Sequence, residues 1–137
     1  MPLFKRCSRC GRRLPAGSTC PCAKRRHQEY DRYSRDKKSK EFYNGQEWIS
    51  ARAAALDIDG GIDVYLYMTQ GMVVAADSVH HIVPLKDDWS LRAELSNLIS
   101  LHHDTHSQIE AMYKRDKTGT QELLRKMLEE YRRGGAV

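Results

Sequence analysis

Large apolar side chains are sparse near the N-terminus of the chain. Residues 23–44 contain neither Pro nor Gly and are rich in Lys, Arg and Glu, which favour helix. The large rings in this stretch are Tyr30, Tyr33, Phe42 and Tyr43. Because so few rings cannot form a buried stripe, the pattern predicts an exposed basic helix. Its tyrosines either contact DNA or dock the helix on the rest of the protein, and the sequence leaves both alternatives open.

Apolar residues become frequent and regularly spaced after Asn44. This residue is a candidate helix cap, and the segment "DIDGG" is a stop signal, so together they bracket a predicted helix. The apolar residues at core-like spacing in that helix are Trp48, Ile49, Ala53 and Leu56. Residues 62–85 are rich in Val, Ile and Tyr and are broken at "TQG", which predicts a hairpin or a pair of short strands.

The C-terminal residues return to a helical pattern. Thr118 and Gln121 form a capping-box candidate, and Gly134-Gly135 is a stop signal. The residues expected on the packed face are Leu123, Leu124 and Met127. Helices combined with short strands predict an α+β fold.

Charge divides the chain more sharply than hydropathy does. Residues 1–53 hold 14 Lys/Arg and 5 Asp/Glu, whereas residues 54–137 hold 9 and 13. The first part is therefore expected to bind a polyanion, because cations gain affinity for phosphates by releasing condensed counterions. The alternative is a solvated helix face. No apolar run approaches the roughly 20 residues of a membrane span, and no signal-peptide core is present, so we expect a cytoplasmic protein without a membrane partner.

The four cysteines of the chain lie together in "CSRCGRRLPAGSTCPC". They form two short pairs separated by turn-forming residues, which is the arrangement that a structural zinc ion needs. Two disulfides are the weaker alternative for a chain without a secretory signal. The predicted zinc ligands are Cys7, Cys10, Cys20 and Cys22.

Five of the six histidines lie between residues 80 and 106. His80 and His81 end a predicted strand, where adjacent side chains point to opposite faces, so one can bind metal while the other faces a substrate. His106 is expected in the first turn of a helix that begins with a capping box at Thr105 and Gln108, with Asp104 near its N-terminus. Glu110 then lies one turn further on the same face and can share an ion with His106. His102 and His103 are expected in the preceding loop.

The segments "VHHIVPL" and "LSNLISLHHDTH", preceded by "FYNGQEW", resemble the motifs of HNH endonucleases, in particular the small phage-encoded ones. The resemblance covers residues 42–110 and implies the ββα-metal fold, in which a two-stranded ribbon packs on one helix with a divalent cation (Mg, Mn, Ni or Zn) between them. Many relatives also bind a second, structural zinc through two Cys-x-x-Cys pairs, but His102 and Thr105 occupy the second pair here. We therefore expect the central fold to be held by packing of Val64, Leu66, Val74, Ile82, Leu98 and Leu101.

The resemblance also implies a role for individual residues. His80 and His106 are metal ligands, with Glu110 and His102 as further candidates, and His81 is the general base. Asn97 is the asparagine of the motif. The basic residues predicted to contact DNA are Arg25, Arg26, Arg32, Arg35, Lys37 and Lys38.

The predicted organisation has three parts: a zinc knuckle (residues 1–23), a basic helical linker (24–43) and an HNH nuclease domain with a C-terminal helix (44–137). The predicted activity is metal-dependent hydrolysis of DNA, in a phage-infected or prophage-carrying bacterial host. Association with phage packaging machinery follows from the resemblance alone, and the oligomeric state stays open. Two alternatives are a non-catalytic zinc-knuckle DNA-binding adaptor with a vestigial HNH site and a different metallohydrolase that uses the same ligands.

Overall fold

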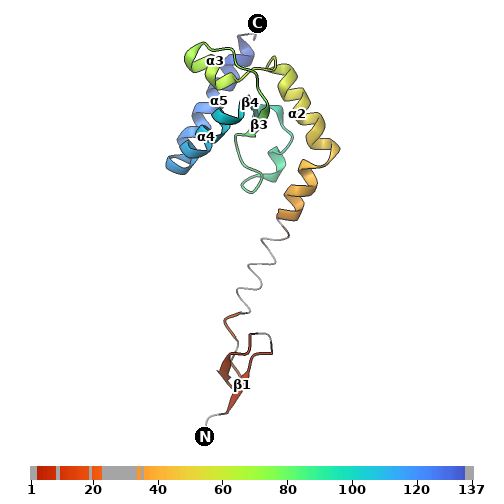
Figure 1. Cartoon of the computed structure of the whole chain (residues 1–137), viewed down its shortest axis with the longest axis vertical. Coiled ribbons are helices and arrows are strands. Elements are labelled where there is room, and N and C mark those ends of the chain that lie inside the picture. Colours follow the sequence, from red (N-terminus) through yellow and green to blue (C-terminus); the bar gives the residue numbers. More distant parts are fainter. Residues whose placement is uncertain (1–2, 9, 19, 23–33, 35, 135–137) are drawn as a thin grey trace. The chain divides into compact units, whose positions relative to one another are not determined.

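The computed structural model describes residues 3–8, 10–18, 20–22, 34 and 36–134 (Figure 1). The chain divides into two compact units, Met1–Lys40 and Glu41–Val137. The finer division into three parts remains a prediction.

The first unit contains a short antiparallel hairpin. Strand β1 (Phe4–Arg6) pairs with β2 (Arg13–Pro15), with Lys5 opposite Leu14. Gly11 lies between the strands with a positive φ of 75°, a conformation that glycine adopts at little cost. The described residues from 36 to 43 are helical, as the sequence predicts for the end of the basic segment.

The second unit is built around another antiparallel ribbon. Strand β3 (Ser78–His81) pairs with β4 (Leu98–Leu101), and α4 (His103–Arg115) follows β4 almost at once. Two 3-10 turns, η1 (Trp89–Leu91) and η2 (Leu95–Asn97), lie in the connection between the strands. The ribbon lies between α2 (Gln46–Ile58) on one side and α4 with α5 (Lys117–Arg133) on the other (Figure 1).

Two apolar clusters hold these elements together. The cluster beside α4 and α5 contains Val64, Ile82, Ile99, Leu101, Ile109, Leu124, Met127, Leu128 and Tyr131. The cluster beside α2 contains Phe42, Trp48, Ala51, Ala55, Val79, Leu85 and Leu98. The ribbon thus contributes to both, because successive strand residues point to opposite faces. Burial on both faces fixes the register of the ribbon, since a one-residue slip would exchange its two sets of side chains.

The prediction of strands at residues 64–70 is wrong. This segment forms α3 (Val64–Gln70), whose N-cap Asp63 accepts a hydrogen bond from the Leu66 N–H at 2.8 Å. Gly71 ends the helix in the left-handed conformation, with φ 67°. A side-chain cap at one end and a glycine at the other override the strand preference of Val and Tyr, which reflects packing more than backbone preference. The partner of β3 is instead β4, far along the chain.

The predicted helix boundaries also need correction. Gly45 and not Asn44 caps α2, and His102 caps α4 by accepting from the Asp104 N–H, so this helix begins before the predicted capping box. Asp116 caps α5 through the Gly119 N–H, ahead of the predicted box at residue 118. The caps of α4 and α5 therefore lie earlier in the chain than predicted, and the cap of α2 lies one residue later.

Some predicted core residues are more exposed than expected. Ile49, Ala53 and Leu123 are exposed, and Leu66 and Val74 are only partly buried. The buried positions of α2 are Trp48, Ala51 and Ala55, so the packed face of the helix is turned from the predicted one. None of the helices in the described part of the chain combines the length and the hydropathy needed to cross a bilayer.

Candidate active site

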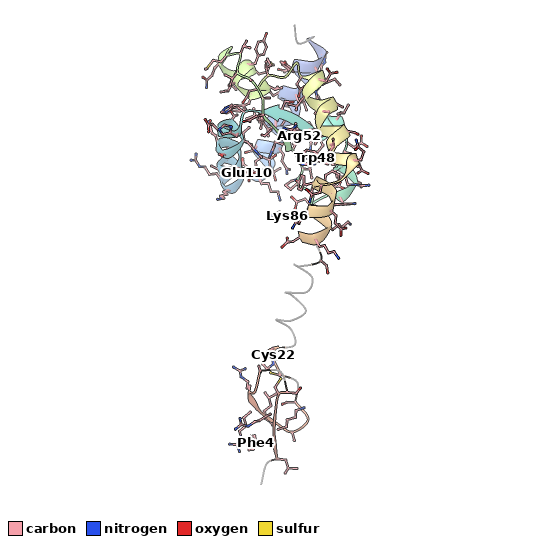
Figure 2. All side chains as sticks on the ribbon, turned by 45° about the vertical axis from the view of Figure 1, so that its right-hand side comes forward. Phe4, Cys22, Trp48, Arg52, Lys86 and Glu110 are labelled. Atoms are coloured by element: carbon pink, nitrogen blue, oxygen red, sulfur yellow. The ribbon has the colours of Figure 1, made fainter. Side chains whose placement is uncertain are left out.

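The neighbouring histidines of β3 point to opposite faces of the ribbon. The His80 ring lies 4.9 Å from the ring of His106 on α4. The His81 ring stacks on Trp48 of α2, with ring centroids 4.9 Å apart and planes inclined by 25°. Figure 2 labels one residue from each side, Glu110 on α4 and Trp48 on α2. The alternation expected of a regular strand therefore holds at this pair.

A cluster of potential metal ligands forms where β3 meets α4. His80, His106 and Glu110 each place one ligand atom so that these atoms lie within 4.8 Å of one another. Glu110 Oε1 is 3.2 Å from His106 Nε2 and 4.0 Å from His80 Nδ1. The helical spacing of four residues brings His106 and Glu110 together, as predicted. Two imidazoles and a carboxylate are a donor set suited to divalent transition metals.

The His80 ring is kept neutral by its surroundings. Only 5% of the residue is exposed, and burial, followed by the nearby imidazoles of His106 and His81, lowers its pKa to about 3. Its Nε2 atom is buried and has no hydrogen-bond partner among the described residues. The nitrogen that faces Glu110 is Nδ1, at 4.0 Å. A neutral imidazole is the form that coordinates a metal, so the charge state of His80 and the donors of His106 and Glu110 beside it fit a bound cation.

Tyr113 supports the same side of the ribbon. Its ring meets the edge of His80 with centroids 5.1 Å apart, and its hydroxyl donates to the Ile82 carbonyl at 2.5 Å. Burial, with a further contribution from Glu110, raises the pKa of the phenol, so the hydroxyl remains a donor. Tyr113 thus links α4 to the end of β3.

An aromatic pocket surrounds His81. Besides Trp48, the rings of Phe42 and Tyr43 lie 6.2 and 6.0 Å from the imidazole. The residue is 7% exposed, and burial lowers its pKa, while the hydrogen bond to the Arg92 carbonyl acts in the opposite direction. Because a carbonyl only accepts, the contact of 2.9 Å between His81 Nε2 and Arg92 O fixes Nε2 as the donor. The other nitrogen, Nδ1, is left to accept a proton.

Asn97 ties together the loop between the two histidines and β4. Its Oδ1 accepts from the Val83 N–H at 2.8 Å, and its Nδ2 donates to the carbonyls of Val83 and Leu91 at 3.1 and 3.3 Å. The Ile82 N–H donates to the Asn97 carbonyl at 2.9 Å. Asn97 therefore touches neither the His80 cluster nor the His81 ring in these contacts, and it holds the loop that carries the Arg92 carbonyl.

The structure does not bring His102 to the His80 cluster. His102 caps α4 and lies with Asp77 and His103, where one ligand atom from each also falls within 4.8 Å. Asp77 Oδ2 is 2.6 Å from His103 Nδ1, and its other oxygen accepts from the His103 N–H. This ion pair lowers the pKa of Asp77 and raises that of His103, chiefly through the hydrogen bond between them. It joins the start of β3 to the start of α4.

The four cysteines of the first unit converge. Cys7 Sγ is 3.6 Å from Cys22 Sγ, and Cys10 Sγ is 3.4 Å from Cys20 Sγ. All four sulfurs lie within 4.8 Å of one another, and none of them is in a disulfide. For Zn–S bonds of about 2.3 Å, a tetrahedral site places its sulfurs roughly 3.8 Å apart. The cluster is therefore compatible with a zinc knuckle.

Arg25, Arg26, Arg32 and Arg35 lie outside the described residues. Lys37 and Lys38 are exposed on the helical segment.

The residues that support the two histidines are not among the predicted site residues. Tyr113 follows His106 and Glu110 at helical spacing, so the sequence of α4 carries a signal for it. Trp48 was expected to be only a core residue. No local pattern relates it, Phe42 or the Arg92 carbonyl to His81, because these contacts join distant parts of the chain.

An antiparallel ribbon, a helix directly after it and a donor cluster at their junction define a ββα-metal site. No protein-family model matches the chain, and neither does any curated protein. Among solved structures, the chain is similar to the HNH endonuclease of the deep-sea thermophilic bacteriophage GVE2, whose crystal structure contains a manganese ion. The two are 34% identical with a TM-score of 0.59, and the similarity covers 64% of this chain and 94% of the phage protein.

The chain therefore belongs to the HNH endonuclease family. The predicted fold class is confirmed: helices flank a small ββα core, and the four-cysteine cluster lies near the N-terminus. The similarity supports a nuclease-type function and a divalent metal at the family level.

Proposed function

We propose that this protein is a metal-dependent endonuclease that hydrolyses the phosphodiester bonds of DNA. His81 acts as the general base, and His80, His106 and Glu110 hold one divalent cation. The observation that carries the proposal is the opposite orientation of His80 and His81, which puts a donor cluster and a proton acceptor on adjacent residues of one strand.

The surroundings of His81 suit a base. Its lowered pKa keeps the imidazole neutral at physiological pH, and the Arg92 carbonyl fixes the tautomer in which Nδ1 accepts a proton from water. When Nδ1 takes up that proton, the hydrogen bond from Nε2 to the carbonyl stabilises the imidazolium. Trp48 restricts rotation of the ring, so the acceptor keeps its direction. Asn97 contributes by holding the loop that carries the Arg92 carbonyl.

The donor set of His80, His106 and Glu110 determines which metals the cluster favours. Two imidazoles and one carboxylate suit Mn, Ni or Zn, whereas Mg prefers a shell of oxygen ligands. A cation held by these residues would supply Lewis-acid activation of the phosphate and charge stabilisation for the leaving oxygen. Glu110, whose side chain is 60% exposed, is the ligand able to adjust its position when a cation binds.

We further propose that Cys7, Cys10, Cys20 and Cys22 bind one structural zinc. Four thiolates close the coordination shell, so this zinc is not catalytic. Elemental analysis of reduced protein after mild dialysis tests the assignment, with about one tightly held zinc per chain expected. Less than half an equivalent, or two disulfides by mass after reducing preparation, contradicts it.

The activity itself is tested with supercoiled plasmid. Purified protein is incubated with Mg, Mn, Ni or Zn, with EDTA as the control, and relaxed and linear products are separated on a gel. We expect metal-dependent nicking or linearisation that EDTA abolishes. Binding of the plasmid without cleavage in any of the metals would favour the DNA-binding adaptor.

A further inference from the structure

One face of the hairpin in the first unit carries two arginines directly opposite each other. In the β1–β2 register Arg6 pairs with Arg13 and Phe4 with Pro15, so these four residues share one face. We call it the hairpin face. All four are exposed, whereas Leu14, on the other face, is buried. The apolar support of the hairpin thus lies away from the arginines.

This pairing of like charges is unfavourable for the hairpin alone. Opposed residues in an antiparallel pair have Cβ atoms about 4.5–5.5 Å apart, and like charges at that separation destabilise the sheet. No Asp or Glu precedes Glu29 in the sequence, so the hairpin supplies no carboxylate of its own. Among the described residues, neither arginine forms an ion pair within 4.0 Å. An anion between the two guanidinium groups would remove the repulsion.

The hairpin face also holds one guanidinium in place. Arg13 Cζ lies 4.2 Å above the centre of the Phe4 ring, and Phe4 is 48% exposed. A cation–π contact of this kind orients the planar fork of an arginine and lowers the entropy lost when it binds a phosphate. Arg6, opposite it, supplies the second fork. The cysteine cluster follows β1 directly and brackets β2, so it constrains both strands.

We propose that the hairpin face is a phosphate clamp for the backbone of duplex DNA, separate from the catalytic cluster. Arg6 and Arg13 each contact phosphate oxygens, and Phe4 positions Arg13. Guanidinium groups suit phosphate because their paired N–H groups match two oxygens. The clamp rests on the proposed function only in taking DNA as the ligand, and it gives the knuckle a binding role besides its structural one.

The clamp is tested by the salt dependence of binding in the full-length chain. A fluorescein-labelled duplex is titrated by anisotropy across a KCl series, with His81→Ala as a common background to prevent cutting and no chelator, so that the cysteine cluster keeps its metal. Each phosphate contact adds about 0.9 to the slope of log affinity against log salt, so Arg6→Gln with Arg13→Gln should lower the slope by roughly 1.8. Arg6→Gln alone, which leaves the Phe4–Arg13 stack intact, should lower it by about 0.9.

Lys126→Gln with Arg133→Gln is the matched control, because it removes the same charge from exposed positions of α5. This control should leave the slope unchanged. Equal slopes for the hairpin variants and the parent, with zinc content retained, would overturn the clamp. If the double variant loses zinc, the single Arg6→Gln variant decides.

Two further outcomes are distinguishable. If the parent chain fails to bind any duplex, DNA as the substrate is in doubt and the proposed function fails with the clamp. If Phe4→Ala weakens binding to a single strand of equal length more than binding to the duplex, base stacking on Phe4 replaces the phosphate clamp.

Discussion

His80 and His81 are adjacent in β3, yet the two faces of the ribbon give them different chemistry. On one face, His80 lies beside three side chains from α4, namely those of His106 and Glu110 and the ring of Tyr113. On the other face, His81 is enclosed by aromatic rings and makes its hydrogen bond to a backbone carbonyl. Burial lowers the pKa of both, so both rings are neutral near pH 7.

The comparison shows that a neutral imidazole can serve either as a metal ligand or as a proton acceptor, depending on its surroundings. A neutral imidazole among other donors is a ligand, whereas a neutral imidazole held by one carbonyl and an aromatic wall is a proton acceptor. Adjacent residues of a strand can take these two roles because their side chains point to opposite faces. If this account is right, substitutions on one face should leave the property of the other face unchanged.

The largest effect is expected from His81→Ala. Removal of the proton acceptor should lower the cleavage rate by about 10²–10⁴, with metal affinity and folding near normal. Plasmid cleavage and calorimetry with Mn are the measurements. His103→Ala, which removes an exposed imidazole outside both faces, should remain active. A rate above half that of the parent would reject His81 as the base.

His80→Ala should weaken metal binding more than it weakens the chemistry. Mutation of a residue that hydrogen-bonds to a metal ligand typically lowers metal affinity by about 10–100-fold. Loss of the ligand itself should therefore lower metal affinity by at least that much. Excess Mn should then restore part of the cleavage, which it cannot do for His81→Ala. Unchanged metal binding by calorimetry would mean that the roles of the two histidines are reversed.

Trp48→Phe tests the aromatic face without removing the base. A smaller ring leaves the imidazole less restrained, and a misplacement of about 1 Å can cost up to roughly 10² in rate, so we expect a fall in kcat of about tenfold. Metal affinity should not change. Trp89→Phe is the matched control, because that ring packs on Phe42 at 5.6 Å and beneath Arg92. Equal losses in both variants would indicate general loosening of the aromatic cluster.

The part of this arrangement that depends on local spacing could be predicted from the sequence. Strand alternation separates His80 from His81, and helical spacing joins His106 to Glu110, so both relations follow from residues close together in the chain. The expectation that the two histidine-containing motifs lie together in the fold came from the family resemblance, because no local pattern indicates it. The roles assigned to these residues remain predictions.

The part that depends on distant contacts could not be predicted. The wall around His81 comes from residues 42–48 and the carbonyl from residue 92, and only the folded unit brings them together. The error at residues 64–70 has another cause, since the cap from Asp63 and the turn at Gly71 outweighed a strand-like composition. Asp63 also accepts from the His102 N–H at 2.9 Å, so its position is fixed by the start of α4 as well as by α3.

The smallest effect is expected from Tyr113→Phe, which tests whether Tyr113 helps to position His80 on its face of β3. The variant keeps the ring beside His80 but removes the hydrogen bond to the Ile82 carbonyl. One lost hydrogen bond of this kind costs about 0.5–1.5 kcal/mol of stability, which urea unfolding can measure. Because Ile82 follows the two histidines, the lost restraint should also lower Mn affinity, by at most about tenfold, at the low end of the range for outer partners.

Tyr65→Phe is the matched control for this variant. Within the described part of the chain, its hydroxyl bonds to the Met112 sulfur at 3.9 Å, a weak acceptor, so removing it should cost little stability and leave Mn affinity unchanged. If Tyr113→Phe loses stability without losing Mn affinity, then Tyr113 packs the core and does not position His80. If it lowers Mn affinity while the single-turnover rate at saturating Mn stays that of the parent, the two faces of β3 are energetically separate, because a disturbance at the end of the strand reaches the ligand and not the base.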